Sequence, residues 1–195
     1  ELDPATMTVI VEPGVLLKDL QAYVEERGLF YPPDPGEKAS SIGGNISTNA
    51  GGMRAVKYGV TRDYVRGLEV VLADGTVMQV GGKQVKDASG LSLKCLLRLV
   101  PKPEASLSVL VPYADLKTGI QSVLTILRAN ANPTAVEFME RKVVALGERF
   151  CGVSYPRPDA GSYILLTFDG RSEEVTANAA RVRSLALQNG ALDFI

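Results

Sequence analysis

The sequence predicts an α+β protein with two modules, and three observations lead to this fold class. Runs of β-branched and apolar residues alternate with segments whose apolar residues recur at the period of an α-helix. A Gly- and Pro-rich stretch of 22 residues, from Tyr31 to Gly52, interrupts that alternation in the first half. A stiff Pro-Lys-Pro segment follows a change of composition after Val100, so we divide the chain into modules at 1–103 and 104–195.

The first module is predicted to contain a strand, a helix and, after the Gly-rich stretch, a hairpin. β-branched runs indicate the strands, a period of 3.6 indicates the helix, and Asp-Gly indicates the hairpin turn. The apolar stripe of the helix is predicted to include Leu16, Leu20 and Val24. The expected elements are a strand at 8–12, a helix at 15–27, and hairpin strands at 67–73 and 76–80.

The second module is predicted to have the order β-α-β-(α)-β-α-β, which is typical of a ferredoxin-like fold. Asp115 is a good N-cap for the first helix, and Asn189-Gly190 is a good C-terminal pair for the last. The expected strands are 107–111, 135–139, 163–168 and 192–195, and the expected helices begin after Asp115 and span 141–149 and 172–189.

Composition excludes several classes of function. The 21 basic and 22 acidic residues form no basic run, which argues against a nucleic-acid partner. No apolar stretch approaches the ~18 residues of a membrane span, and the N-terminal residues do not resemble a signal peptide. The chain has no histidine, so it offers no histidine base, metal ligand or covalent cofactor anchor, and no metal-ligand spacing occurs. Cys95 and Cys151 are expected to be reduced thiols in a cytoplasmic protein.

The stretch 31–52 is the most informative part of the sequence. Three prolines and five glycines argue against a regular helix there. Glycine lets the backbone approach a large flat or anionic group, and hydroxyl and amide side chains bind phosphate without adding charge. We therefore predict a loop that wraps a phosphorylated cofactor. The alternative is a tight Gly-rich turn region that bridges two strands.

Three segments carry a resemblance to a known family. They are Tyr-Pro-Pro-Asp-Pro-Gly at 31–36, Ser-Ile-Gly-Gly-Asn-Ile-Ser-Thr-Asn-Ala-Gly-Gly at 41–52, and Lys-Tyr-Gly-Val-Thr-Arg-Asp-Tyr-Val-Arg-Gly-Leu-Glu-Val-Val-Leu-Ala-Asp-Gly at 57–75. Together they resemble the family of the glycolate oxidase FAD subunit and D-lactate dehydrogenase, which are flavoproteins of the vanillyl-alcohol-oxidase type. The close resemblance covers residues 8–103, and a looser one continues to the C-terminal end.

The resemblance implies a fold, a cofactor and a set of contacts. Residues 1–103 would be the second half of a vanillyl-alcohol-oxidase-type (PCMH-type) FAD-binding domain, and residues 104–195 part of a ferredoxin-like substrate (cap) domain. FAD would be bound non-covalently, because the chain has no histidine and no suitably placed cysteine. The residues implied to bind FAD are Asp34, Pro35, Gly36, Ser40, Ser41, Gly43, Gly44, Asn45, Thr48, Asn49, Ala50, Gly51 and Gly52.

Within this set the resemblance implies three kinds of contact. Asp34, Pro35 and Gly36 would form a turn that aims at the cofactor, although a plain Asp-Pro-Gly turn needs the same residues. The backbone N–H groups of residues 40–45 would meet the pyrophosphate, and residues 48–52 would lie against the isoalloxazine ring.

The side chains that follow the loop leave alternatives open. One cation among Arg54, Lys57 and Arg62 would stabilise a reduced flavin near its N1 atom, but a solvated surface charge is the commoner role of such a residue. Tyr58 either stacks on a ligand or fills the core.

Three parts of the family pattern are absent. A Gly-Ser-Glu-Gly-Thr-Leu-Gly loop is missing where Leu97 and Arg98 abut, so it was either deleted or is present in the intact protein. We expect the second, because excision would leave the apolar residues on either side without their partners. A first FAD subdomain would precede Glu1. The rest of the cap, with the family's histidines, would follow Ile195.

The resemblance implies part of an FAD-dependent oxidoreductase that converts a D-2-hydroxy acid, such as glycolate or D-lactate, to the 2-oxo acid by hydride transfer to flavin N5. The expected partners are the hydroxy-acid substrate and the electron-transfer subunits with which such a protein could assemble. Two alternatives remain open: a non-catalytic FAD-binding or assembly subunit of an electron-transfer complex, and an interaction module that has lost FAD.

Overall fold

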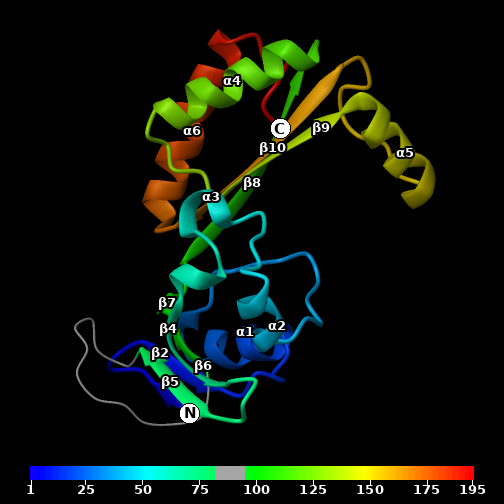
Figure 1. The fold of residues 1–195 in the computed structure, drawn as a ribbon. Coiled ribbons are helices and arrows are strands. Elements are labelled where there is room, and N and C mark those ends of the chain that lie inside the picture. Colours follow the sequence, from blue (N-terminus) through cyan, green and yellow to red (C-terminus); the bar gives the residue numbers. More distant parts are fainter. Residues whose placement is uncertain (82–94) are drawn as a thin grey trace. The chain divides into compact units, whose positions relative to one another are not determined.

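The structure is a computed structural model, and it describes residues 1–81 and 95–195. The chain divides into two compact units, Glu1–Lys102 and Pro103–Ile195, whose folds can be followed in Figure 1. Each unit combines antiparallel β-sheet with α-helices, which confirms the predicted α+β class.

Unit 1 is built on a five-stranded antiparallel sheet with the order β1-β2-β6-β4-β5. A separate two-stranded sheet pairs β3 with β7. The strands are β1 (Leu2–Asp3), β2 (Thr8–Val11), β3 (Leu29–Phe30), β4 (Val65–Val71), β5 (Val77–Gly81), β6 (Cys95–Arg98) and β7 (Val100–Pro101).

The helix α1 (Leu17–Glu25) packs on this sheet through Leu17, Leu20 and Val24. The prediction gave Leu16 in place of Leu17 and is wrong by one residue, because Leu16 is the extended N-cap and the helix begins after it. Residues 17, 20 and 24 follow the i, i+3, i+7 spacing of one helical face.

The Gly-rich stretch contains a short helix that the sequence analysis excluded. The elements after β3 are α2 (Ile42–Ser47), α3 (Ala55–Tyr58) and a 3₁₀ turn, η1 (Thr61–Asp63). All three prolines of the stretch precede α2, so none removes a donor inside it. The Ser41 hydroxyl caps the helix by accepting a hydrogen bond from the Gly44 N–H at 3.1 Å, which offsets part of the low helix propensity of glycine.

The junction at Leu97 and Arg98 lies inside strand β6, which pairs with β2 on one side and with β4 on the other. The 195-residue sequence runs through the junction without the Gly-rich loop, and retention of that loop in the intact protein stays a prediction. The apolar residues before the junction keep packing partners, since Leu96 and Leu97 are both buried.

Unit 2 has a three-stranded antiparallel sheet with the order β8-β10-β9. Its central strand pairs over nine residues with β8 and over six with β9. The elements are β8 (Ala105–Tyr113), α4 (Leu116–Arg128), β9 (Ala135–Glu140), α5 (Arg141–Cys151), β10 (Ser162–Gly170) and α6 (Ser172–Gln188).

The last residues complete the predicted ferredoxin-like order. Leu110 and Ile195 exchange backbone hydrogen bonds of 2.8 and 3.0 Å, and the Leu192 N–H donates to the Pro112 carbonyl at 2.8 Å. The C-terminal residues therefore run beside β8, and the spatial order becomes C-terminal segment, β8, β10, β9, as in a split βαβ unit. Helix α5 is an insertion between β9 and β10.

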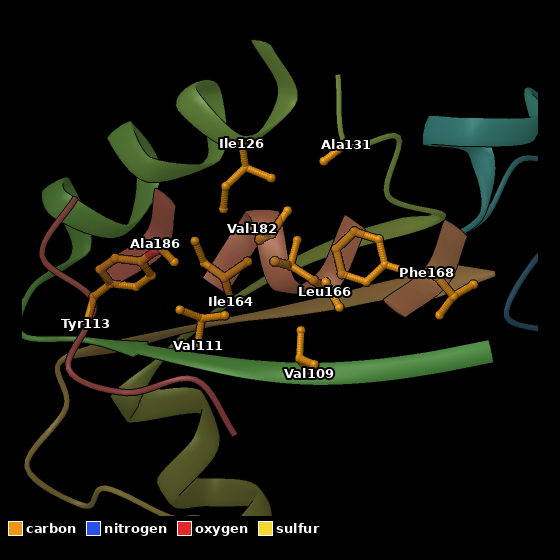
Figure 2. Packing of buried hydrophobic residues seen from close by; sticks show 12 residues of the cluster. Val109, Val111, Tyr113, Ile126, Ala131, Ile164, Leu166, Phe168, Val182 and Ala186 are labelled. Atoms are coloured by element: carbon orange, nitrogen blue, oxygen red, sulfur yellow. The ribbon is translucent and has the colours of Figure 1, made fainter. Parts of the chain in front are cut away.

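The core of unit 2 lies between one face of this sheet and helices α4 and α6. Figure 2 shows Val111 and Ile164 pointing from the strands toward Ile126 of α4 and Val182 of α6. A smaller cluster of Val144, Ala160 and Tyr163 lies on the other face, where α5 covers part of the sheet.

Candidate cofactor-binding site

The residues predicted to bind a cofactor all lie in unit 1, between β3 and α3, and the structure brings two of their segments together. The chain from Tyr31 to Asp34 is buried and then emerges at Gly36. Gly52 returns to the same place, since a Cβ atom on Gly52 would overlap the backbone carbonyl of Asp34. Glycine is required at position 52 by this close approach of the protein's own backbone.

Four of the five glycines of the stretch fall into two groups, and a Cβ atom on the fifth, Gly51, would lie 3.3 Å from Cγ1 of Val60. A Cβ atom on Gly43 would lie 2.7 Å from the Cβ of Pro13, so this glycine, like Gly52, accommodates the protein itself. Gly36 has no heavy atom within 4 Å of an added Cβ, and Gly44 meets only the Ser41 hydroxyl at 3.1 Å. Gly36 and Gly44 are exposed, so they offer open backbone surface to a ligand.

The backbone N–H groups predicted to meet a pyrophosphate are largely used within the protein. The N–H of Ile42 donates to the Val15 carbonyl at 2.8 Å, and that of Gly43 donates to the Pro13 carbonyl at 2.8 Å. The N–H groups of Ser40, Gly44 and Asn45 also have internal acceptors. The contact of residues 40–45 with a cofactor stays a prediction, but it does not rest on free N–H groups at these positions.

The second part of the loop is braced by its own side chains. The Thr48 hydroxyl donates to the Gly44 carbonyl at 3.0 Å. Asn49 has a φ of 49°, which asparagine tolerates better than most residues, and its side-chain oxygen accepts the N–H of Arg62 at 3.0 Å. The Ala50 carbonyl accepts both the N–H and the hydroxyl of Thr61, at 3.1 and 2.6 Å. These hydrogen bonds brace the loop from within.

A charged cluster joins the two segments. Asp34 is buried, and its carboxylate forms ion pairs with the ammonium of Lys38 and, at 3.4 Å, with Nε of Arg54. The Arg54 guanidinium lies 4.9 Å from the centre of the Phe30 ring, and that ring meets Tyr58 edge-on at 6.0 Å. Arg54 is therefore not a solvated charge, and Tyr58 packs against the core of unit 1.

Burial shifts the pKa of Lys38, a member of this cluster, and of Tyr31, three residues before Asp34 in the sequence. Desolvation lowers the pKa of Lys38, and repulsion from Arg54 lowers it further, while Glu25 partly opposes the change. Burial strongly raises the pKa of the Tyr31 phenol, whose side chain is fully enclosed. The sequence analysis did not single out Lys38, although its position four residues after Asp34 was a usable signal.

The described residues fit a group that combines phosphates with a flat ring. Exposed glycines and the exposed hydroxyl residues Ser47 and Thr48 form a small, uncharged surface. The Asp34 cluster, with two cations and one carboxylate, adds one positive charge beside it. Such a surface can bind an anionic ligand but offers no acid–base pair for catalysis.

Two family models match the chain, one in each half. The FAD binding domain matches residues 1–81, and the C-terminal domain of FAD linked oxidases matches residues 102–195. The cofactor segments described above lie within the first match.

Relatives of this chain match along nearly its whole length. It is 41% identical to a D-lactate dehydrogenase of Anaerostipes hadrus, over 99% of the chain and 45% of the relative. It is 37% identical to the glycolate oxidase subunit GlcD of Bacillus subtilis, over 98% of this chain and 44% of the relative. It is 32% identical to a D-2-hydroxyglutarate dehydrogenase of Stutzerimonas stutzeri, over 97% of this chain and 44% of the relative. The chain thus spans a little under half the length of these relatives.

Solved structures share the fold. An alkyldihydroxyacetonephosphate synthase superposes with a TM-score of 0.80 at 14% identity, over 98% of this chain and 41% of that one. A p-cresol methylhydroxylase with bound substrate superposes with a TM-score of 0.72 at 18% identity, over 100% of this chain and 46% of that one. At these identities the likeness establishes the fold alone.

Proposed function

We propose that this chain, which belongs to the family of FAD-linked oxidases, is part of an FAD-dependent enzyme that oxidises a D-2-hydroxy acid of the glycolate or D-lactate type to the 2-oxo acid. The observation that carries the proposal is the match with D-lactate dehydrogenase and glycolate oxidase relatives over 98–99% of the chain, including the Gly-rich segments. Relatives of this kind give no support to a non-catalytic assembly subunit.

We assign cofactor binding to unit 1. The residues that would hold FAD are those of the segments 34–36, 40–45 and 48–52, with exposed backbone at Gly36 and Gly44. When bound, the flavin supplies a hydride acceptor, its N5 atom, for the hydrogen on the α-carbon of the acid. The protein's part is to orient the cofactor, and internal hydrogen bonds of Thr48 and Asn49 brace the loop for that role.

Non-covalent attachment is the mode of binding that these residues favour. The chain contains no histidine that could form a covalent link. Cys95 is buried in strand β6, where desolvation raises the pKa of its thiol and makes it a poor nucleophile. The proton of the substrate hydroxyl is likewise not taken by a histidine of this chain.

Partners and location complete the proposal. The substrate is a small 2-hydroxy acid, and electron-transfer subunits are proposed as acceptors on the family resemblance alone. Across residues 1–81 and 95–195, none of the helices has the length and apolar character to cross a membrane. A cytoplasmic location is proposed because both cysteines are free thiols, as is usual in a reducing compartment.

The test is anaerobic reduction of the purified full-length protein. D-lactate or glycolate is expected to bleach the flavin absorbance, and L-lactate is expected to leave it unchanged. A protein that retains FAD but is bleached by neither acid would refute the oxidase assignment and favour the non-catalytic subunit. A protein that purifies without flavin and cannot be reconstituted with FAD would refute cofactor binding itself.

A further inference from the structure

Two cations share one buried carboxylate in unit 1, and they are held differently. The side chain of Asp34 is 8% exposed, that of Arg54 31% and that of Lys38 47%. Arg54 stacks on Phe30 and stands at the N-cap of α3, so its backbone and its guanidinium are both fixed. Lys38 reaches Asp34 from an exposed loop with a flexible four-carbon chain, so its ammonium can leave while Arg54 remains.

The charges of this cluster do not balance. Lys38, Arg54 and Asp34 together carry one net positive charge. The neighbouring pair of Glu25 and Lys102, 3.4 Å apart, is neutral as a pair. Burial is the main cause of the lowered pKa of Lys38, and repulsion from Arg54, the second cause, reflects this excess of positive charge. An incoming anion would relieve this repulsion.

The cluster of Asp34, Lys38 and Arg54 also links the two segments of the candidate site. Asp34 belongs to the segment 31–36, and Arg54 lies two residues after the segment 48–52, so their ion pair links the two parts of the predicted cofactor loop. The Lys38 carbonyl accepts the N–H of Lys18 at 3.1 Å, which fixes the backbone of Lys38 against α1. Only the end of the Lys38 side chain is then free to change partner.

We propose that Lys38 is a phosphate-binding residue whose ammonium moves from Asp34 to a phosphate of the bound cofactor, and that Arg54 is a positioning residue that keeps Asp34 neutralised and the two loop segments joined. This inference rests on the proposed function, because it takes FAD as the source of the phosphate. The same cation would also suit the carboxylate of a hydroxy acid, and the experiment separates these two anions.

The experiment measures flavin binding by full-length apoprotein through flavin fluorescence, with FAD and riboflavin as probes. Lys38→Gln is expected to weaken FAD binding about 10-fold. This is the lower end of the range for a charge-assisted hydrogen bond, because the half-exposed side chain of Lys38 is partly screened by water. Riboflavin, which has no phosphate, is expected to bind the variant and the unsubstituted protein equally. The salt dependence of FAD affinity is expected to decrease in the variant and to return in Lys38→Arg.

Lys117→Gln on α4 is the matched control, because it removes the same charge from an exposed position in unit 2, and it is expected to bind both probes normally. Arg54→Gln is expected to weaken FAD and riboflavin alike, because it loosens the loop rather than removing a phosphate contact. Far-UV circular dichroism identifies any variant that fails to fold.

Three outcomes would overturn the inference. Equal losses for FAD and riboflavin in Lys38→Gln would make Lys38 structural. Unchanged FAD affinity would remove it from the phosphate site, and if the KM of the hydroxy acid rises instead, the substrate carboxylate is its partner. Failure of the unsubstituted protein to bind FAD would refute the proposed function itself, which is a different result from normal FAD binding by Lys38→Gln.

Discussion

The core of unit 2 and the candidate site in unit 1 are held by different kinds of interaction, although unit 1 has an apolar core of its own. Unit 2 rests on nine consecutive residue pairs between β8 and β10 and on an apolar cluster to which strands and helices both contribute. The candidate site in unit 1 rests on short helices, side-chain caps, close backbone contacts at glycine and one charged cluster. The first arrangement buries apolar surface, whereas the second mainly satisfies polar groups.

This difference indicates where each of these two regions obtains its stability. Apolar burial contributes about 25 cal/mol for each Å² removed from water, and it needs no ligand. Hydrogen bonds and half-exposed ion pairs contribute about 0–1.5 kcal/mol each, so a loop built from them depends more on its ligand. We therefore expect unit 2 to be the self-sufficient part and the site in unit 1 to gain most from FAD.

The largest effect is expected in the core of unit 2. Leu166 is fully buried among the apolar side chains of the sheet and of helices α4 and α6, as Figure 2 shows. Leu166→Ala should lower the free energy of unfolding by about 2–5 kcal/mol, measured by urea denaturation. Leu124→Ala, on the exposed side of α4, should change it by less than about 0.5 kcal/mol. Similar losses in the two variants would contradict the apolar core as the source of stability.

A smaller but more specific effect is expected at Gly52. Gly52→Ala places a methyl group against the Asp34 carbonyl and should cost about 1–3 kcal/mol in the stability of unit 1, with a loss of FAD binding. Gly36→Ala, at a position with open space, should leave the free energy of unfolding within about 0.5 kcal/mol of the unsubstituted protein. If Gly52→Ala has the same free energy of unfolding and the same FAD affinity as the unsubstituted protein, the segments around Asp34 and Gly52 do not approach as described.

The smallest effect is expected at the cap of α2. Ser41→Ala removes the hydroxyl that accepts the Gly44 N–H and should cost about 1 kcal/mol. Because α2 is short, the loss should appear as faster hydrogen exchange of α2 amides, while α4 amides in unit 2 keep their rates. Bound FAD should slow α2 exchange again. If α2 amides exchange more slowly than α4 amides without FAD, the site does not need its ligand for stability. That result would contradict the expected difference between the site and unit 2.

The sequence alone predicted the order of elements in unit 2, because the helices and strands of that unit follow regular apolar periods. The stripes of α4 and α6 and the runs of β8 and β10 specify ferredoxin-like order, since helix and strand periods determine which side chains are buried. The same reasoning missed α2, because its glycines have low helix propensity and its stability comes from Ser41 and from contacts with Pro13.

The site was predicted as a region but not in its details. The Gly-rich composition indicated positions 34–52, yet it did not show that Gly43 and Gly52 serve the protein's own packing. Nor did it show which cation would be fixed, because the Arg54 ion pair joins residues twenty positions apart and depends on how the chain folds back. Whether the predicted residues contact FAD stays a prediction that the variants above can test.

The central place of β10 in unit 2 has a consequence for synthesis of the protein. Both neighbours of β10 precede it, and its first residue, Ser162, comes 49 positions after Tyr113, the last residue of β8. At about 5–20 residues per second, a ribosome needs roughly 2–10 s to make the stretch between them. During that time β8, and β9 once it is made, lack the central strand with which both pair. Unpaired apolar strands are templates for aggregation, so the nascent chain is most vulnerable just before its central strand emerges.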